Sequence, residues 1–134
     1  PDPASVIPAR RSAPVSKNAD ISRHLEEERL AGVVVHNGLA YLAGQVADDA
    51  SLDTEGQTVD ILRQIDALLA SLGTDKSRIL SVQIFLTDIG EIVAMNRAWD
   101  AWLDTAHKPA RATVEAKLAV PEWRVEMTAI AALK

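Results

Sequence analysis

Two stretches near the end of the chain, residues 109–121 and 122–132, alternate between apolar and polar side chains. A period of two predicts β-strands, because successive side chains of a strand point to opposite faces of its sheet. The Val120–Pro121 dipeptide between the stretches favours a short turn, and therefore an antiparallel pair. One face of this predicted pair sets Arg111, Thr113 and Glu115 near Glu126, Thr128 and Ile130. The other, apolar face is expected in the core and comprises Ala112, Val114, Ala116, Leu118, Trp123, Val125, Met127, Ala129 and Ala131.

The charged patch on this pair has two interpretations. Charged strand residues most often form a solvated face with cross-strand ion pairs, and the pattern alone favours that interpretation. The alternative is an anion site. A guanidinium on a strand can hold a carboxylate through two hydrogen bonds, and a neighbouring carboxylate can orient or deprotonate a water molecule.

Two earlier segments have apolar residues at helical spacing, and each predicts a helix with one apolar stripe. The first helix is predicted over Thr54–Leu72, and its stripe comprises Val59, Ile61, Leu62, Ile65, Leu68, Leu69 and Leu72. The second opens at Asp88–Glu91, which resembles a capping box, and ends near Ala106, before Lys108–Pro109. Its stripe comprises Ile92, Met95, Trp99, Trp102 and Leu103.

Three further strands are predicted. Residues 32–36 and 39–45 flank Asn37–Gly38, which favours a two-residue hairpin turn because both positions tolerate positive φ. Gly44, near the end of the second strand, indicates a bulge or a close approach of backbone. Residues 79–87 alternate, with Leu80, Val82, Ile84 and Leu86 on one face and Ser81, Gln83, Phe85 and Thr87 on the other. Residues 20–30 could form a helical turn or an irregular lead-in.

The predicted order is strand, strand, helix, strand, helix, strand, strand, which is an α+β arrangement. Two helices with one apolar stripe each can cover one face of the sheet and no more. The far face is too mixed for solvent and too polar for a monomer core, since it is predicted to carry Gln83, Phe85, Thr113, Glu126 and Ile130. We therefore expect this face to pack against other copies of the chain in closed symmetry, with a functional cleft at the interface.

Composition narrows the possible functions. The 134 residues fit one domain, predicted over 19–134, preceded by a mobile tail at 1–18 that holds four of the six prolines. A net charge of -5 argues against a partner bound through nucleic-acid phosphates, and no apolar run is long enough to span a membrane. Without a secretory signal, the cytoplasm is the default location. There is no cysteine, and His24 beside Glu26–Glu28 is too isolated to predict a metal site.

Three segments resemble the reactive-intermediate deaminase family, known as RidA or YjgF: Ala43–Val46, Pro109–Glu115 and Val125–Ala131. The resemblance covers about residues 31–134. It implies a chorismate-mutase-like α+β fold, in which three chains pack their sheets into a barrel and leave a cleft at each subunit interface.

The activity implied by this resemblance is hydrolysis of 2-imino or enamine acids to 2-oxo acids and ammonia, without a metal or organic cofactor. Arg111 would hold the substrate carboxylate and Glu126 would position the attacking water. The substrate pocket would include Ala43, Gly44, Phe85 and Thr113. The best-known members of the family have Cys where this chain has Thr113 and Ser where it has Ala43.

Three other functions stay open at this point. The chain could be a non-catalytic carboxylate-binding or chaperone-like trimer that uses the same arginine. It could be a deaminase of one pathway, acting on aminomuconate-type compounds. RNA cleavage has also been attached to the family, and the acidic charge makes it the weakest of the three.

Overall fold

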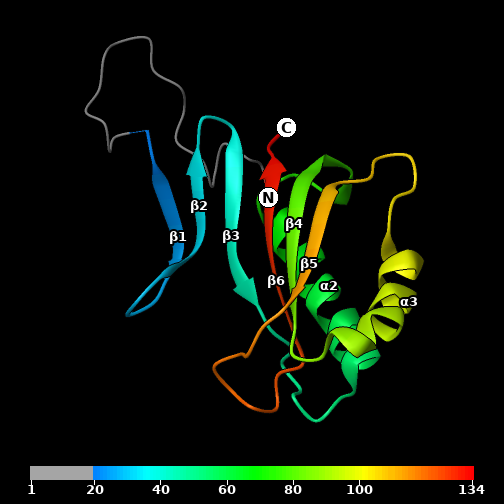
Figure 1. Ribbon diagram of the computed structural model, residues 1–134. Coiled ribbons are helices and arrows are strands. Elements are labelled where there is room, and N and C mark those ends of the chain that lie inside the picture. Colours follow the sequence, from blue (N-terminus) through cyan, green and yellow to red (C-terminus); the bar gives the residue numbers. More distant parts are fainter. Residues whose placement is uncertain (1–19) are drawn as a thin grey trace.

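Six strands form one mixed sheet in the order β1-β2-β3-β6-β4-β5, with two helices on one of its faces (Figure 1). The computed structural model describes residues 20–134, so the predicted tail at 1–18 lies outside the described residues. The strands are β1 Ser22–Glu26, β2 Ala31–His36, β3 Leu39–Gln45, β4 Ile79–Leu86, β5 Ala110–Glu115 and β6 Val125–Ala132. This architecture confirms the α+β fold class predicted from the sequence.

The helix α2 spans Thr54–Ser71 and follows its predicted boundaries closely. The side chain of Asp53 accepts a hydrogen bond from the backbone N–H of Gly56 at 2.8 Å, which satisfies one of the free donors at the helix start. Gly73 follows the helix with φ +75°, a conformation that favours glycine. Most of the apolar stripe is buried as predicted, but Leu68 is only half-buried and Val59 is 56% exposed.

The helix α3 spans Ile92–Trp102, so the predicted end near Ala106 is wrong. A short 3-10 turn, η2 Ile89–Glu91, precedes it, and the Asp88 carboxylate accepts the N–H of Gly90 in that turn at 2.8 Å. The predicted capping residue therefore starts the 3-10 turn and not α3. A second 3-10 turn, η1 Lys76–Arg78, leads into β4.

The core lies between the two helices and the central strands β3, β6 and β4. Alternate residues of β6 are buried as the sequence predicts: Val125, Met127, Ala129 and Ala131. In β4 the prediction is wrong at one position, because Leu80 is 49% exposed and Ile79 is buried in its place. The register of β4 against β6 shifts between Ile79 and Ser81. Because of this irregularity, the side chains at the start of the strand lie on the faces opposite to those predicted.

The strand β1 was not predicted. It pairs antiparallel with β2, and Leu25 interrupts the ladder with a φ of 55°. Residues Glu26–Glu28 form a charged run directly after this irregularity. The segment therefore lacks the alternation of apolar and polar residues that predicts a strand. Among the described residues, neither helix combines the length and the apolar character that crossing a membrane requires.

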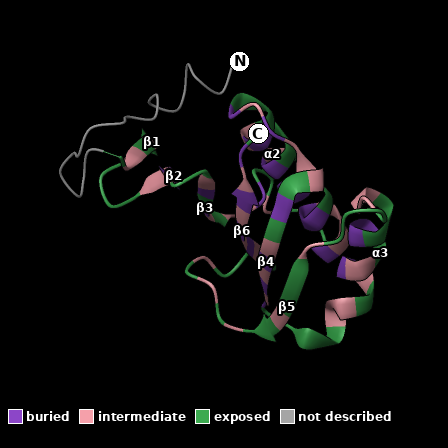
Figure 2. Cartoon of the chain, turned by 90° about the horizontal axis from the view of Figure 1, so that it is seen from above, coloured by how far each residue is buried: buried purple, intermediate pink, exposed green. Residues whose placement is uncertain are grey.

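The strand β5 pairs with β4 in parallel, so the predicted antiparallel pair of the last two strands is wrong. The order β4, α3, β5 is a strand–helix–strand crossover, the connection that makes neighbouring strands parallel. As a result β4 lies between β5 and β6. The predicted apolar core face of β5 is also wrong, since Ala112 is exposed and Val114 is 44% exposed (Figure 2).

Candidate functional site

Glu126, the second residue of β6, lies directly over the backbone of Gly44 in β3. A Cβ atom added to Gly44 would lie 2.2 Å from Oε2 of Glu126, closer than any real contact of this kind. The register of β3 against β6 shifts between Leu42 and Gln45, so Gly44 belongs to the irregularity predicted from its sequence position. The absent side chain at Gly44 is what makes room for the carboxylate.

Phe85 and Ala43 lie next to this contact. Phe85 on β4 is the direct neighbour of Glu126 on one side and of Val114 on the other, and paired residues of neighbouring strands share a face. Ala43 is half-buried, and its carbonyl accepts a hydrogen bond from Nε2 of Gln45 at 2.9 Å. The helix-free face of the sheet thus brings Glu126, Gly44 and Phe85 together, and the sequence pattern had placed Glu126 and Phe85 on this face.

Arg111 and Thr113 lie on the opposite face. Their neighbours on β4 are Val82 and Ile84, which are buried against the helices. The guanidinium of Arg111 reaches helix α3, so the side chain points to the helix side of the sheet. Arg111, Thr113 and Glu115 were predicted on the same face as Glu126. That placement is wrong, because the parallel pairing of β5 sets the alternation the other way.

On this helix side, Arg111 has two partners from α3. Its guanidinium carbon lies 5.0 Å from the ring centroid of Trp99, and its Nη1 donates to Oδ1 of Asn96 at 2.8 Å. The hydroxyl oxygen of Thr113 is buried and has no hydrogen-bond partner in the described part of the chain. Glu115, also predicted in the charged patch, accepts the backbone N–H of Ile89 at 3.0 Å and anchors η2.

Residues 23–133 match the family model described as endoribonuclease L-PSP. A RutC family protein of Haemophilus influenzae is 49% identical over 112 residues, which cover 83% of this chain and 97% of that protein. The RutC family protein YoaB of Escherichia coli is 44% identical, over 80% of this chain and 93% of its own.

The crystal structure of a YjgF family member from Neisseria meningitidis is 43% identical to this chain. It superposes with a TM-score of 0.83 over 86% of this chain and 96% of that one. The chain belongs to the RidA/YjgF/RutC family. The resemblance found in the sequence is therefore confirmed, and a role that acts on small molecules is consistent with this membership.

In this RidA/YjgF chain, one buried glutamine supports the Glu126 side of the site. Gln57 on α2 is completely buried, and its Oε1 accepts the N–H of Arg124 at 2.9 Å. Its Nε2 donates to the carbonyls of Ala50, Leu52 and Glu122 at 3.2, 3.0 and 3.0 Å. The amide thereby joins the loop after β3 to the turn before β6. Sequence reasoning missed it, although a glutamine one turn before Ile61 on the apolar stripe was a usable signal.

The loop after β3 has a second anchor on α2. Asp60 accepts hydrogen bonds from Arg63 Nη2 at 2.6 Å and from the backbone N–H of Asp48 at 2.7 Å. These bonds, the one from Arg63 first, hold the pKa of the Asp60 carboxyl below its usual value. Nε2 of Gln64 adds a bond to the carbonyl of Val46 at 2.9 Å.

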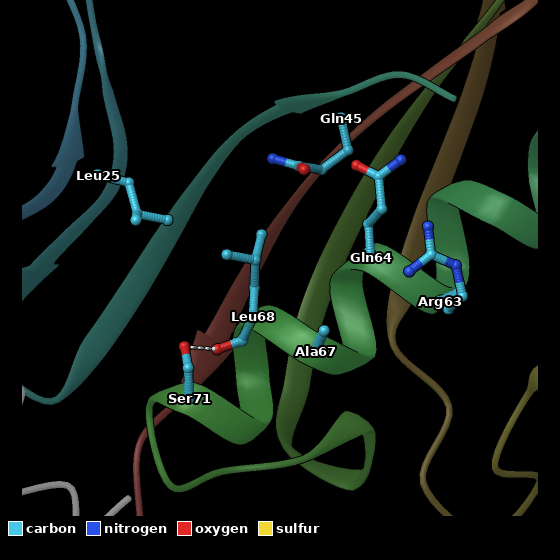
Figure 3. Close-up of a pocket in the computed structure, with 7 residues that line it drawn as sticks. All are labelled: Leu25, Gln45, Arg63, Gln64, Ala67, Leu68 and Ser71. Atoms are coloured by element: carbon cyan, nitrogen blue, oxygen red, sulfur yellow. Dashed lines mark hydrogen bonds between the residues drawn. The ribbon is translucent and has the colours of Figure 1, made fainter. Parts of the chain in front are cut away.

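A pocket of about 390 Å³ lies beside this anchor, and neither Arg111 nor Glu126 is among its lining residues (Figure 3). It is lined by Leu25, Gln45, Arg63, Gln64, Ala67, Leu68 and Ser71. Its polar side chains already have partners within the protein, such as Ser71 Oγ, which donates to the carbonyl of Leu68 at 2.6 Å. Across residues 20–134, no three His, Cys, Asp or Glu side chains converge in a way that could hold a metal ion.

Proposed function

We propose that this chain hydrolyses 2-imino or enamine acids to 2-oxo acids and ammonia, with Arg111 holding the substrate carboxylate and Glu126 positioning water. The observation that carries the proposal is the state of these two charges. Neither side chain takes part in an ion pair among residues 20–134, whereas Arg63 and Arg97 of the same chain are each paired with a carboxylate. An unpaired cation and an unpaired anion suit the two ends of an anionic substrate and its water.

The chemistry asks little of the protein. An imine carbon is already electrophilic, so a water molecule held by Glu126 can add to it once the substrate is anchored through its carboxylate. As the oxygen of the attacking water bonds to the carbon, the carboxylate of Glu126 would take one proton from the water and pass it to the nitrogen, which gives a carbinolamine. The proton of the carbinolamine hydroxyl would then pass through Glu126 to the nitrogen as the carbon–nitrogen bond breaks and the carbonyl forms. The products are a 2-oxo acid and ammonia, and water is the only other reactant.

The site would be assembled from two copies of the chain. Arg111 lies on the helix side of the sheet and Glu126 on the helix-free side. A small substrate therefore cannot reach both side chains within a single copy. The helix-free face has apolar side chains suited to an interface, with Tyr41 41% exposed and Phe85 and Ile130 half-buried. In a closed trimer, Arg111 and Thr113 of one copy would face Glu126, Gly44, Ala43 and Phe85 of the next.

Subunit mixing tests this arrangement directly. At substrate concentrations below the wild-type KM, Arg111→Ala and Glu126→Gln chains are each expected to release ammonia and 2-oxo acid from 2-iminobutanoate, generated in situ, far more slowly than the wild type. When the two are unfolded together and refolded, random mixing into trimers completes about a quarter of the sites, so about a quarter of wild-type activity should return. If both residues served one substrate within one chain, mixing would restore nothing. A wild type no faster than spontaneous hydrolysis would reject the deaminase function itself.

A second candidate is a carboxylate-binding trimer without catalysis, which the same unpaired Arg111 supports. It predicts binding of 2-oxo acids that depends on Arg111, no turnover, and no effect of Glu126→Gln. An aminomuconate-type substrate would show as turnover of that compound where 2-iminobutanoate fails. RNA cleavage is disfavoured by the net charge of -5, and incubation with RNA under the same conditions provides its control.

A further inference from the structure

The guanidinium of Arg111 is held in place although it lies on an exposed edge strand. One of its faces lies against the ring of Trp99, 5.0 Å from the centroid, and Nη1 donates to Oδ1 of Asn96 at 2.8 Å. Asn96 and Trp99 are three positions apart on α3, so they present their side chains from the same face of the helix. A long side chain loses rotamer freedom in such a setting before any ligand arrives.

The ring under the arginine is itself fixed. Trp99 is 5% exposed and lies 5.3 Å from the ring of Trp102, at an interplanar angle of 55°. The indole N–H of Trp102 donates to Oδ2 of Asp66 on α2 at 3.0 Å, and Nζ of Lys76 lies 5.2 Å from the Trp102 centroid. This series of contacts ties the position of Arg111 to both helices.

Both partners of Arg111 are neutral, as are the carbonyls of Ala132 and Leu133 that accept from Arg78. Two other arginines are held by carboxylates. Arg63 lies between the carboxylates of Asp60 and Asp48, at 2.6 and 3.2 Å. Arg97, one residue after Asn96, is paired with Glu55 at 2.7 Å. A carboxylate partner would satisfy the guanidinium and compete with any incoming anion, whereas an amide and a ring hold it and leave its charge in place.

We propose that Asn96 and Trp99 are positioning residues, which hold Arg111 ready for a substrate carboxylate without compensating its charge. The assignment of the ligand as a carboxylate rests on the proposed function. The neutrality of Asn96 is then the decisive property, because Asp at this position would have nearly the same shape and could accept the same hydrogen bond. Stability and anion affinity should therefore respond in opposite directions to Asn96→Asp.

The test compares Asn96→Asp and Asn96→Ala with the wild type, using calorimetric titration with 2-oxobutanoate, a carboxylate that is not turned over, together with thermal unfolding. Asn96→Asp should keep or raise Tm through a charge-assisted bond and weaken binding by about tenfold or more. Asn96→Ala should lower Tm and weaken binding by only a few-fold. Where the imine is turned over, both variants should raise KM far more than they lower kcat.

Arg97→Gln is the matched control, since it changes the net charge by the same amount on the same helix and touches Glu55 in place of Arg111. Its affinity for 2-oxobutanoate should stay near that of the wild type. Trp99→Phe should keep most of the affinity and Trp99→Leu should lose it, which offers a separate test if an Asn96 variant folds poorly.

The inference is overturned if Asn96→Asp binds 2-oxobutanoate as tightly as the wild type, or if Arg97→Gln loses as much affinity. It is also overturned if the wild type binds no carboxylate. A wild type that binds 2-oxobutanoate but does not accelerate imine hydrolysis rejects the deaminase function alone, and the order of affinities among the variants still decides the inference.

Discussion

The Glu126 side and the Arg111 side of the candidate site are held by different kinds of contact. Glu126 stands on a central strand, over backbone exposed by a glycine, and a buried glutamine fixes the turn that leads to it. Arg111 stands on the edge strand β5, and side chains of α3 hold it from one side. Backbone and a buried amide leave little freedom to Glu126, the proposed water-positioning group. Contacts from one helix hold Arg111, the proposed anion-binding group, and leave its charge uncompensated.

The largest expected effects are those of substitutions at Glu126 and Arg111, which should change different kinetic parameters. Glu126→Gln keeps the shape of the side chain and removes the base, so kcat should fall by about 10²–10⁴-fold while binding of 2-oxobutanoate persists. Arg111→Ala removes the carboxylate anchor, so KM should rise by about tenfold to hundredfold. Steady-state kinetics with titrations of 2-oxobutanoate measure both. Equal losses of affinity in the two variants would contradict the division of roles.

The next effect concerns the support of Glu126. Gln57→Leu leaves three carbonyls and one N–H without their partner in the interior, so the free energy of unfolding should fall by about 2–4 kcal/mol. Urea unfolding measures this change. Gln64→Leu, on the same helix but half-buried and with two bonds, is the control and should cost less than half as much. Similar losses of unfolding free energy in the two variants would mean that the hydrogen bonds of Gln57 contribute no more to stability than those of Gln64.

A smaller change tests the glycine under Glu126. In Gly44→Ala the new Cβ must displace the Glu126 carboxylate, and a shift of this size should lower kcat by about tenfold to hundredfold while stability changes little. Gly32→Ala is the control, because its Cβ would meet Cβ of Leu25 at 2.8 Å, and β3 separates its strand β2 from β6. That variant should lose stability and keep its turnover per folded molecule. Unchanged turnover in Gly44→Ala would show that Glu126 acts without contact to this backbone.

The smallest effect is a dependence on pH in the loop after β3, on the Glu126 side. The folded-state pKa of Asp60 is lowered, chiefly by Arg63, so its contribution to stability is present above the unfolded value of about 3.9 and is lost as the pH falls through the folded value. Amide exchange at Asp48 should accelerate in that range before exchange in β5 does. In Asp60→Asn this acid-dependent step should be absent. Equal acceleration in β5 would point to global unfolding.

The sequence predicts the helices and most strands because their burial follows local periodicity, as in β6 and in the stripe of α2. The neighbours of β5 could not be found this way, since parallel pairing arises from the crossover through α3 and leaves the same alternation in the sequence. The family resemblance implied the roles of Arg111 and Glu126. The face of the sheet on which each side chain lies depends on the strand pairing, which the sequence pattern did not reveal. Asn96 looks like an ordinary helix residue until its contact with Arg111 is seen.

The irregularity between Leu42 and Gln45 also affects what a deletion in β3 would do to the protein. β3 uses one residue more than β6 over this interval, since Leu42 pairs with Ala129 and Gln45 with Met127. Deleting Ala43 would make the ladder regular, and the fold could keep or gain stability from the added pairing. The backbone under Glu126 would then be an ordinary strand with no open position for the carboxylate. The deletion of this single residue would therefore preserve or raise the stability of the fold and remove the activity proposed for the site.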